Sequence, residues 1–166
     1  MADRGRRAPE GLTIARATEE DIPAIKAMVD SAYSKYIERI GKPPAPMSAD
    51  WKGLIRSPGV WVLRTTEGGG GQEVVGGVVL GVDAASDSVK VNNLVVSPAA
   101  QGRGYGKILM GFAEDTARAE GRPALTLFTN LMMRENLVLY PKLGFHETGR
   151  RTEDGYDRVY YRKDLA

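Results

Sequence analysis

A glycine-rich segment between two apolar runs is the part of this sequence best suited to binding chemistry. It reads Gln101-Gly102-Arg103-Gly104-Tyr105-Gly106-Lys107. Residues 91–96 before it predict a strand, and the run from Tyr105 predicts a helix. A glycine turn at a helix start directs unpaired backbone N–H groups and the positive end of the helix dipole toward an anion. The segment therefore predicts a phosphate-binding loop, to which Arg103 and Lys107 add positive charge.

Two common phosphate motifs do not fit this loop. A Walker A loop requires a glycine five residues before its Gly-Lys pair and Ser or Thr after it, where this chain has Gln101 and Ile108. The third glycine of a dinucleotide fingerprint is absent in either register. The pattern that remains is Gln-x-x-Gly-x-Gly, formed by Gln101, Gly104 and Gly106. It resembles the pyrophosphate loop of the GNAT superfamily of acyl-CoA-dependent N-acyltransferases, although an ordinary strand-to-helix turn would share the pattern.

A second segment makes the resemblance more specific. It is similar to the Leu-Tyr-x-x-x-Gly-Phe element of the same superfamily, with the defining positions held by Leu139, Tyr140, Gly144 and Phe145. In the superfamily a short helix here carries a tyrosine that faces the CoA sulfur, which implies Tyr140 as the general acid. Many members have Asn seven residues before this tyrosine, where this chain has Met133. Asn136 lies four residues before Tyr140, on the same helix face, and is the implied CoA contact instead.

The resemblance implies transfer of an acetyl group from acetyl-CoA to an amine, without a metal. The 102–107 backbone would hold the pyrophosphate, and an extended strand of Leu94, Val95 and Val96 would offer backbone partners to the pantetheine amides. A backbone N–H near Val95 or Val96 would stabilise the oxyanion. Tyr140 would protonate the leaving thiolate, because a phenol pKa of ~10 exceeds the ~8.5 of a thiol.

The acceptor region is predicted from the first helix and the proline-rich stretch after it. Tyr33 and Tyr36 offer aromatic faces and hydroxyls, Glu38 offers a charge, and residues 43–46 offer a rigid wall. We expect a small-molecule primary amine there, although both tyrosines would equally suit a core stripe. An alkylammonium has a pKa of ~10.4 and must lose a proton before it can attack.

No base is evident from the sequence. Some relatives carry a carboxylate on the strand before the glycine loop, where this chain has Asn92 and Asn93. Glu38, Asp83 and bulk water remain as candidates.

Composition excludes several function classes. The net charge is +2, from 23 basic and 21 acidic residues, which indicates neither a nucleic-acid partner nor a membrane surface. The chain has no cysteine and one histidine, His146, so that a disulfide framework and a multi-histidine metal cluster are excluded. The polar, arginine-rich start is unlike a secretory signal, and no apolar run is long enough to span a membrane, which predicts a cytoplasmic protein.

The whole chain predicts one N-acetyltransferase domain at residues 12–166, after a disordered tail at 1–11. Apolar periodicity predicts strands at 12–17, 60–66, 73–83, 88–96, 124–129, 145–150 and 158–162, and a flexible hairpin tip at 68–71. Helices are predicted at 18–40, 50–55, 105–120 and 134–143, with an extended linker at 42–46. The expected fold class is α/β (α+β), with a GNAT-like mixed, mostly antiparallel sheet flanked by helices on both faces.

Two other functions remain open at this point. One is a catalytically silent acyl-CoA-binding sensor or partner module, and the other is an acetyltransferase that acts on protein amines. The sequence also leaves open whether the protein is a monomer or a homodimer.

Overall fold

The computed structural model describes residues 11–66 and 73–166. Within them seven strands form one sheet in the order β1-β2-β3-β4-β5-β7-β6. The strands are β1 (Leu12–Arg16), β2 (Val60–Thr65), β3 (Glu73–Asp83), β4 (Ser88–Val96), β5 (Ala124–Asn130), β6 (His146–Glu153) and β7 (Tyr156–Asp164). The α-helices are α1 (Ile22–Tyr33), α2 (Tyr36–Ile40), α3 (Trp51–Arg56), α4 (Tyr105–Ala119) and α5 (Arg134–Lys142), and short 3₁₀ helices occur at Glu19–Asp21, Ala45–Ser48 and Pro98–Ala100.

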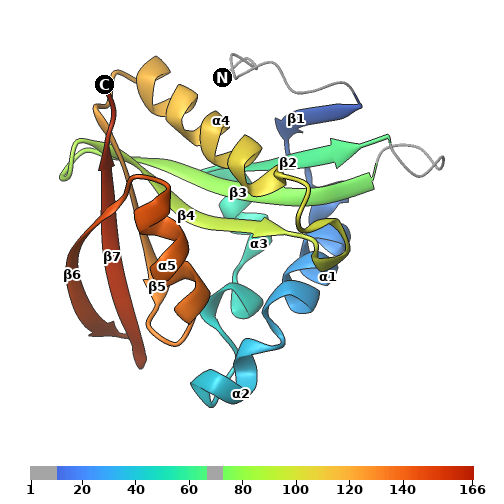
Figure 1. Cartoon of the computed structure of the whole chain (residues 1–166). Helices are drawn as coiled ribbons and strands as arrows, with labels where there is room; N and C mark the ends of the chain where they lie inside the picture. Colours follow the sequence, from blue (N-terminus) through green and yellow to red (C-terminus); the bar gives the residue numbers. More distant parts are fainter. Residues whose placement is uncertain (1–10, 67–72) are drawn as a thin grey trace.

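The sheet is antiparallel at every pairing except the parallel pair of β4 and β5. One core packs α4 and α5 against one face of the sheet and includes Leu109, Leu125 and Phe145. A second, smaller core packs α1 and α3 against the other face and includes Ile25 and Trp51. The helices therefore cover both faces, as Figure 1 shows, and the fold class predicted from the sequence is confirmed.

The middle of the sheet opens between β4 and β5. These strands pair only over Val89–Val91 and Leu125–Leu127, and beyond them β5 continues to pair with β7 alone. Strand β4 also carries a bulge, because Val79 pairs with Asn93 while the next residue, Leu80, pairs with Val91. The bulged residue is Asn92, and a bulge of this kind bends its strand and increases its twist. The second half of β4 therefore borders a gap in the sheet.

Several predicted elements differ from the structure. The single helix predicted at 18–40 is divided into α1 and α2, with Ser34 and Lys35 between them. The linker predicted to be extended contains the 3₁₀ helix Ala45–Ser48, since the backbone N–H of Met47 bonds to the Pro44 carbonyl at 3.0 Å. The hairpin tip at 68–71 and residues 1–10 of the predicted tail lie outside the described residues. In the part of the chain that the structure describes, no helix is long and apolar enough to cross a membrane.

Candidate active site

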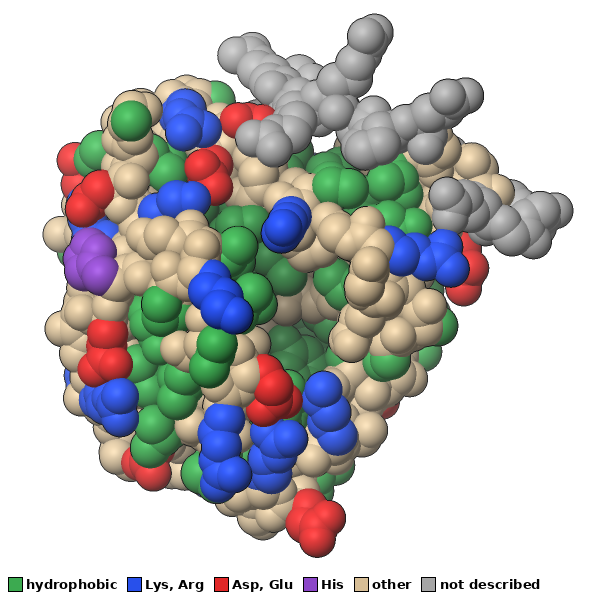
Figure 2. Space-filling model, in the orientation of Figure 1, with side chains coloured by type: hydrophobic (Ala, Val, Ile, Leu, Met, Phe, Trp, Pro, Cys, Tyr) green, Lys and Arg blue, Asp and Glu red, His purple; other side chains and the backbone are tan. Residues whose placement is uncertain are grey.

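A cavity of about 290 Å³ occupies the gap between β4 and β5. Its lining comes from α1, α2 and residues 44–49 on one side, from β4, β5 and β7, and from α5 on the other side. The cavity is therefore lined from both faces of the sheet. In the space-filling view it is visible as a central hollow, in which hydrophobic side chains lie beside uncharged polar side chains or backbone (Figure 2). A ligand in this gap could contact both layers of helices at once.

Tyr140 of α5 lines the cavity and is suited to donate a proton. Its ring packs against Phe145 and Tyr161, with both centroid distances 5.7 Å. Its hydroxyl has no hydrogen-bond partner among the described residues. Burial, followed by the neighbouring Tyr161 and Tyr36, raises the pKa of Tyr140 to about 12. The phenol is therefore fully protonated at neutral pH.

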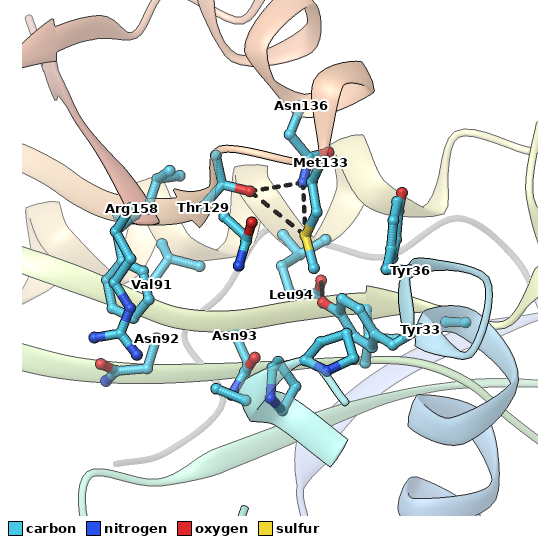
Figure 3. A pocket seen from close by; sticks show the side chains of 18 of the residues that line it. Tyr33, Tyr36, Val91, Asn92, Asn93, Leu94, Thr129, Met133, Asn136 and Arg158 are labelled. Atoms are coloured by element: carbon cyan, nitrogen blue, oxygen red, sulfur yellow. Dashed lines mark hydrogen bonds between the residues drawn. The ribbon is translucent and has the colours of Figure 1, made fainter. Parts of the chain in front are cut away.

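Asn136 lies one turn before Tyr140, and the cavity lining contains both residues. Its side-chain amide donates to the hydroxyl of Thr129 at 2.9 Å and to the sulfur of Met133 at 3.8 Å. Figure 3 shows these three side chains as one bonded group above β4. Met133 is buried and precedes the first residue of α5. Thr129 was missed from the sequence, although it lies only seven residues before Asn136.

Strand β4 presents its backbone to the cavity. Leu94, Val95 and Val96 all belong to the lining, while the side chain of Val95 is buried in the smaller core. The hydroxyl of Tyr33 donates to the Leu94 carbonyl at 3.3 Å, which ties α1 to this strand. Because β5 does not pair with β4 here, the β4 backbone can accept an extended ligand as an added strand.

The glycine loop lies at the N-terminus of α4. Gly102 and Gly104 have φ angles of +86° and +80°, which favour glycine, and a Cβ at either position would have no atom within 4 Å. A Cβ on Gly106 would meet only Val96 Cγ2, at 4.0 Å. This open backbone at the start of a fifteen-residue helix fits a pyrophosphate. The residues present thus fit the CoA expected from the sequence.

The side chains of the loop divide into three groups. Gln101 lines the cavity, and its amide donates to the Val96 carbonyl at 3.5 Å. Arg103 and Lys107 are exposed beside the start of α4, where they could meet phosphates. Tyr105 was expected as a cofactor contact, but its side chain is only 5 % exposed and belongs to the larger core. Any contribution of Tyr105 to the ligand must therefore come from its backbone.

The residues expected at the acceptor end are only partly brought together. Tyr33 and Tyr36 both line the cavity, whereas Glu38 is exposed on α2 and outside the lining. Tyr36 donates to Oε2 of Glu135 at 3.0 Å, and Arg39 donates to the other oxygen of this carboxylate at 2.6 Å. The second carboxylate considered as a base, Asp83, ends β3 and accepts a hydrogen bond from Ser86. Neither Glu38 nor Asp83 reaches the cavity.

Three residues at this end were missed from the sequence. Phe128 is a residue of β5, and Tyr156 and Arg158 are residues of β7. The hydroxyl of Tyr156 donates to the carbonyl of Pro43 at 2.6 Å, and the Lys42 ammonium lies 4.1 Å from the Tyr156 ring centre. The turn between β6 and β7 is thereby held against the linker after α2. No local pattern indicates a contact between residues so distant in the sequence.

A family model and a curated protein that match this chain are both described as acetyltransferases. Residues 56–147 match the family described as the acetyltransferase (GNAT) domain. The chain is 36 % identical over 76 residues to an IAA acetyltransferase of Azospirillum brasilense. That match covers 46 % of this chain and 50 % of the relative, so that the chain spans about half the length of the curated relative it matches.

Solved structures share the fold over nearly the whole chain. The IAA acetyltransferase from Bacillus cereus ATCC 14579 superposes with a TM-score of 0.65 at 22 % identity, covering 93 % of this chain and 99 % of that one. A structure of the NatC complex bound to Gag peptide and CoA contains a chain that superposes with a TM-score of 0.72 at 19 % identity, with coverage of 93 % and 99 %. Similarity at this identity establishes the fold and leaves the acceptor open.

Proposed function

Because the chain belongs to the GNAT acetyltransferase family, we propose that it transfers an acetyl group from acetyl-CoA to a primary amine of a small molecule. The observation that carries this proposal is the cavity between β4 and β5, which is lined by Tyr140 from one side of the sheet and by Tyr33 and Tyr36 from the other. A donor and an acceptor could therefore meet within the gap. A cytoplasmic location and a monomeric or homodimeric state stay predictions.

Residues on the α4 and α5 side would hold acetyl-CoA. The loop from Gln101 to Lys107 offers open backbone and positive charge to the phosphates, and Leu94, Val95 and Val96 offer the edge of β4 that β5 leaves unpaired. Asn136 lines the same cavity, with its side-chain amide nitrogen bonded to Thr129 and Met133. When bound, acetyl-CoA supplies the acetyl group: its thioester C–S bond breaks as the new N–C bond forms, and its sulfur departs as a thiolate.

Tyr140 holds the proton that the departing sulfur requires. Its hydroxyl is not engaged by any described residue, and its pKa of about 12 keeps the proton in place until a strong base approaches. The remaining phenolate would then recover a proton from solvent. A positioned acid of this kind contributes about 10²- to 10⁴-fold to a rate.

The acceptor amine loses its proton without a carboxylate base. None of the described residues that line the cavity is Asp or Glu. The bulge of β4 places Asn92 and Asn93 in the lining, and neither amide is basic. The amine would therefore enter unprotonated or release its proton to water, which predicts a rate that rises with pH up to the pKa of the acceptor ammonium.

The acceptor is small because its side of the cavity is partly closed. The bond from Tyr156 to the Pro43 carbonyl joins the β6–β7 turn to the linker after α2, directly beside the lining residues Pro44 and Ala45. A peptide lying across this side would have to displace that contact. A free amine of a few atoms would not.

Release of free thiol from acetyl-CoA with a mixed panel of amines tests the proposal. We expect release that depends on the amine, and an acetylated amine identified by mass. A silent acyl-CoA-binding module would bind acetyl-CoA in calorimetry yet release no thiol with any amine. An enzyme that acts on protein amines would acetylate peptides and leave the small amines unchanged.

A further inference from the structure

The charges that line the cavity are of one sign only. Lys35 and Arg158 are the ionised residues among the described lining, and no carboxylate accompanies them. An acceptor with several ammonium groups would meet repulsion here and find no counter-charge. An acceptor with a negative group would gain an ion pair. Such a lining would discriminate between amines by their second functional group.

Arg158 lies in the cavity wall beside two aromatic rings. Its guanidinium carbon lies 4.3 Å from the ring centre of Phe128 and 6.0 Å from that of Tyr156. A guanidinium that stacks face to face on an aromatic ring keeps its N–H edge available for a planar anion. In the close-up view Arg158 and Asn92 lie together at one end of the cavity, opposite Tyr33 and Tyr36 (Figure 3).

Arg158 has no carboxylate partner within the described residues. Asp157, next to it in the sequence, accepts a hydrogen bond from Thr152 instead. Glu153, the last residue of β6, does not line the cavity. A further cation lies close by, since Lys90 approaches the same Phe128 ring at 5.2 Å. Arg158 therefore brings a positive charge to this part of the cavity wall that no ion pair within the described residues neutralises.

We propose that the acceptor amine carries a carboxylate, and that Arg158 binds this carboxylate through its N–H edge. The inference rests on the proposed function, since it names the acceptor class of the same cavity. A guanidinium and a carboxylate form two parallel charge-assisted hydrogen bonds, which fix the orientation as well as the affinity. Lys35 at the α1–α2 junction adds positive charge to the same cavity.

Matched pairs of amino acids and their amides, such as glycine with glycinamide and phenylalanine with phenylalaninamide, test this inference. Calorimetry on the CoA-loaded protein should show each acid binding about tenfold or more tightly than its amide. The KM values of the acetylation reaction should follow the same order. The amide has the less basic amine, so the comparison is not biased toward the acid.

Arg158→Gln should abolish the preference for the acid, and Arg158→Lys should retain part of it, because the charge remains while the planar fork is lost. Arg151→Gln is the matched control. Arg151 also stacks on a ring, with its guanidinium carbon 4.1 Å from the centre of Tyr160, but it lies outside the cavity lining. It should leave the preference unchanged, and melting temperatures of all variants establish that they are folded.

Equal affinity for acids and amides, tighter binding of spermidine, or a preference that survives in Arg158→Gln would each overturn the inference. Failure to detect binding of any acid would do the same. The binding measurement does not depend on turnover. Thiol release only with amines that lack a carboxylate would contradict this inference and leave the proposed function standing. Selective binding of acids without any thiol release would support this inference and contradict the proposed function.

Discussion

Tyr36 of α2 donates a hydrogen bond of 3.0 Å to Oε2 of Glu135, the second residue of α5, and so joins the two helices that border the cavity on opposite sides of the sheet. Arg39 completes the group by pairing with the other oxygen of Glu135. The Arg39 hydrogen bond, assisted by further bonds that include Tyr36, lowers the pKa of Glu135 to about 2. Tyr36 itself is buried, and its pKa is raised to about 12.

This contact should contribute to stability in a defined pH window. Since the folded-state pKa of Glu135 is depressed, its contribution is present above its ordinary value of 4.5 and is lost as the pH falls toward about 2. The difference in unfolding free energy between the wild type and Glu135→Gln should therefore shrink over that range in urea titrations. The difference should be small, because the carboxylate is about half exposed. Glu38→Gln, on the exposed side of α2, is the control variant. If the difference in unfolding free energy between the wild type and Glu135→Gln stays constant over this pH range, the assignment is contradicted.

Gly106→Ala should show whether phosphates contact this backbone, because the substitution changes CoA affinity without straining the fold. The added methyl group has room in the free protein, and alanine favours a helix by up to about 1 kcal/mol over glycine, so stability should be kept or raised. Affinity for CoA should nevertheless fall about tenfold, or about 1.4 kcal/mol, if phosphates lie on this backbone. Gly149→Ala on β6, where a Cβ would meet no atom within 4 Å, should leave affinity unchanged. Identical calorimetric affinities for the two variants would place the phosphates elsewhere.

Tyr140→Phe removes the proton donor and keeps the ring. We expect kcat to fall by roughly ten- to a thousandfold with little change in the KM for acetyl-CoA. With a pKa of about 12, Tyr140 should cause no fall in the wild-type rate at any pH below about 11. Tyr161→Phe alters the same aromatic cluster outside the cavity and should keep its kcat. An unchanged kcat in Tyr140→Phe, with the best amine under single-turnover conditions, would exclude this residue as the acid.

Tyr156→Phe should weaken the contact that partly closes the acceptor side of the cavity, without affecting the CoA side. The variant loses the 2.6 Å bond to the Pro43 carbonyl, which is worth about 0.5–1.5 kcal/mol. We expect a KM for the small amine that is a few-fold higher, and improved acetylation of larger amines, while CoA affinity stays the same. Tyr160→Phe changes a neighbouring ring that is outside the cavity lining. If both variants show the same amine KM as the wild type, the turn does not limit access.

Much of the fold and the α4–α5 side of the site follows from local sequence. The glycine loop, the helix after it, and the shared face of Asn136 and Tyr140 depend on residues close together in the chain, so that spacing alone predicts them. The predicted family is likewise confirmed. The assigned roles of these residues stay predictions until the variants are measured.

The acceptor side could not be predicted in the same way. The break between α1 and α2 carries no glycine or proline, and the tyrosines on either side of it bond to distant groups, Leu94 and Glu135. The bulge at Asn92 depends on the register of β3 against β4. Arg158 reaches the cavity only because β7 pairs with β5, which places it opposite Asn130. Long-range pairing decides each of these features, and no local periodicity encodes it.

Beyond the short pairing of β4 with β5, the residues on the acceptor side should tolerate substitution better than the core residues. The acceptor-side residues on β5 and β7, Phe128, Tyr156 and Arg158, belong to neither apolar core, whereas Leu125, Leu127 and Val159 on the same strands are core residues. Substitution at the first group should cost little folding free energy. The set of amines that the protein accepts can therefore diversify, in nature or in the laboratory, while the scaffold that would hold acetyl-CoA stays intact.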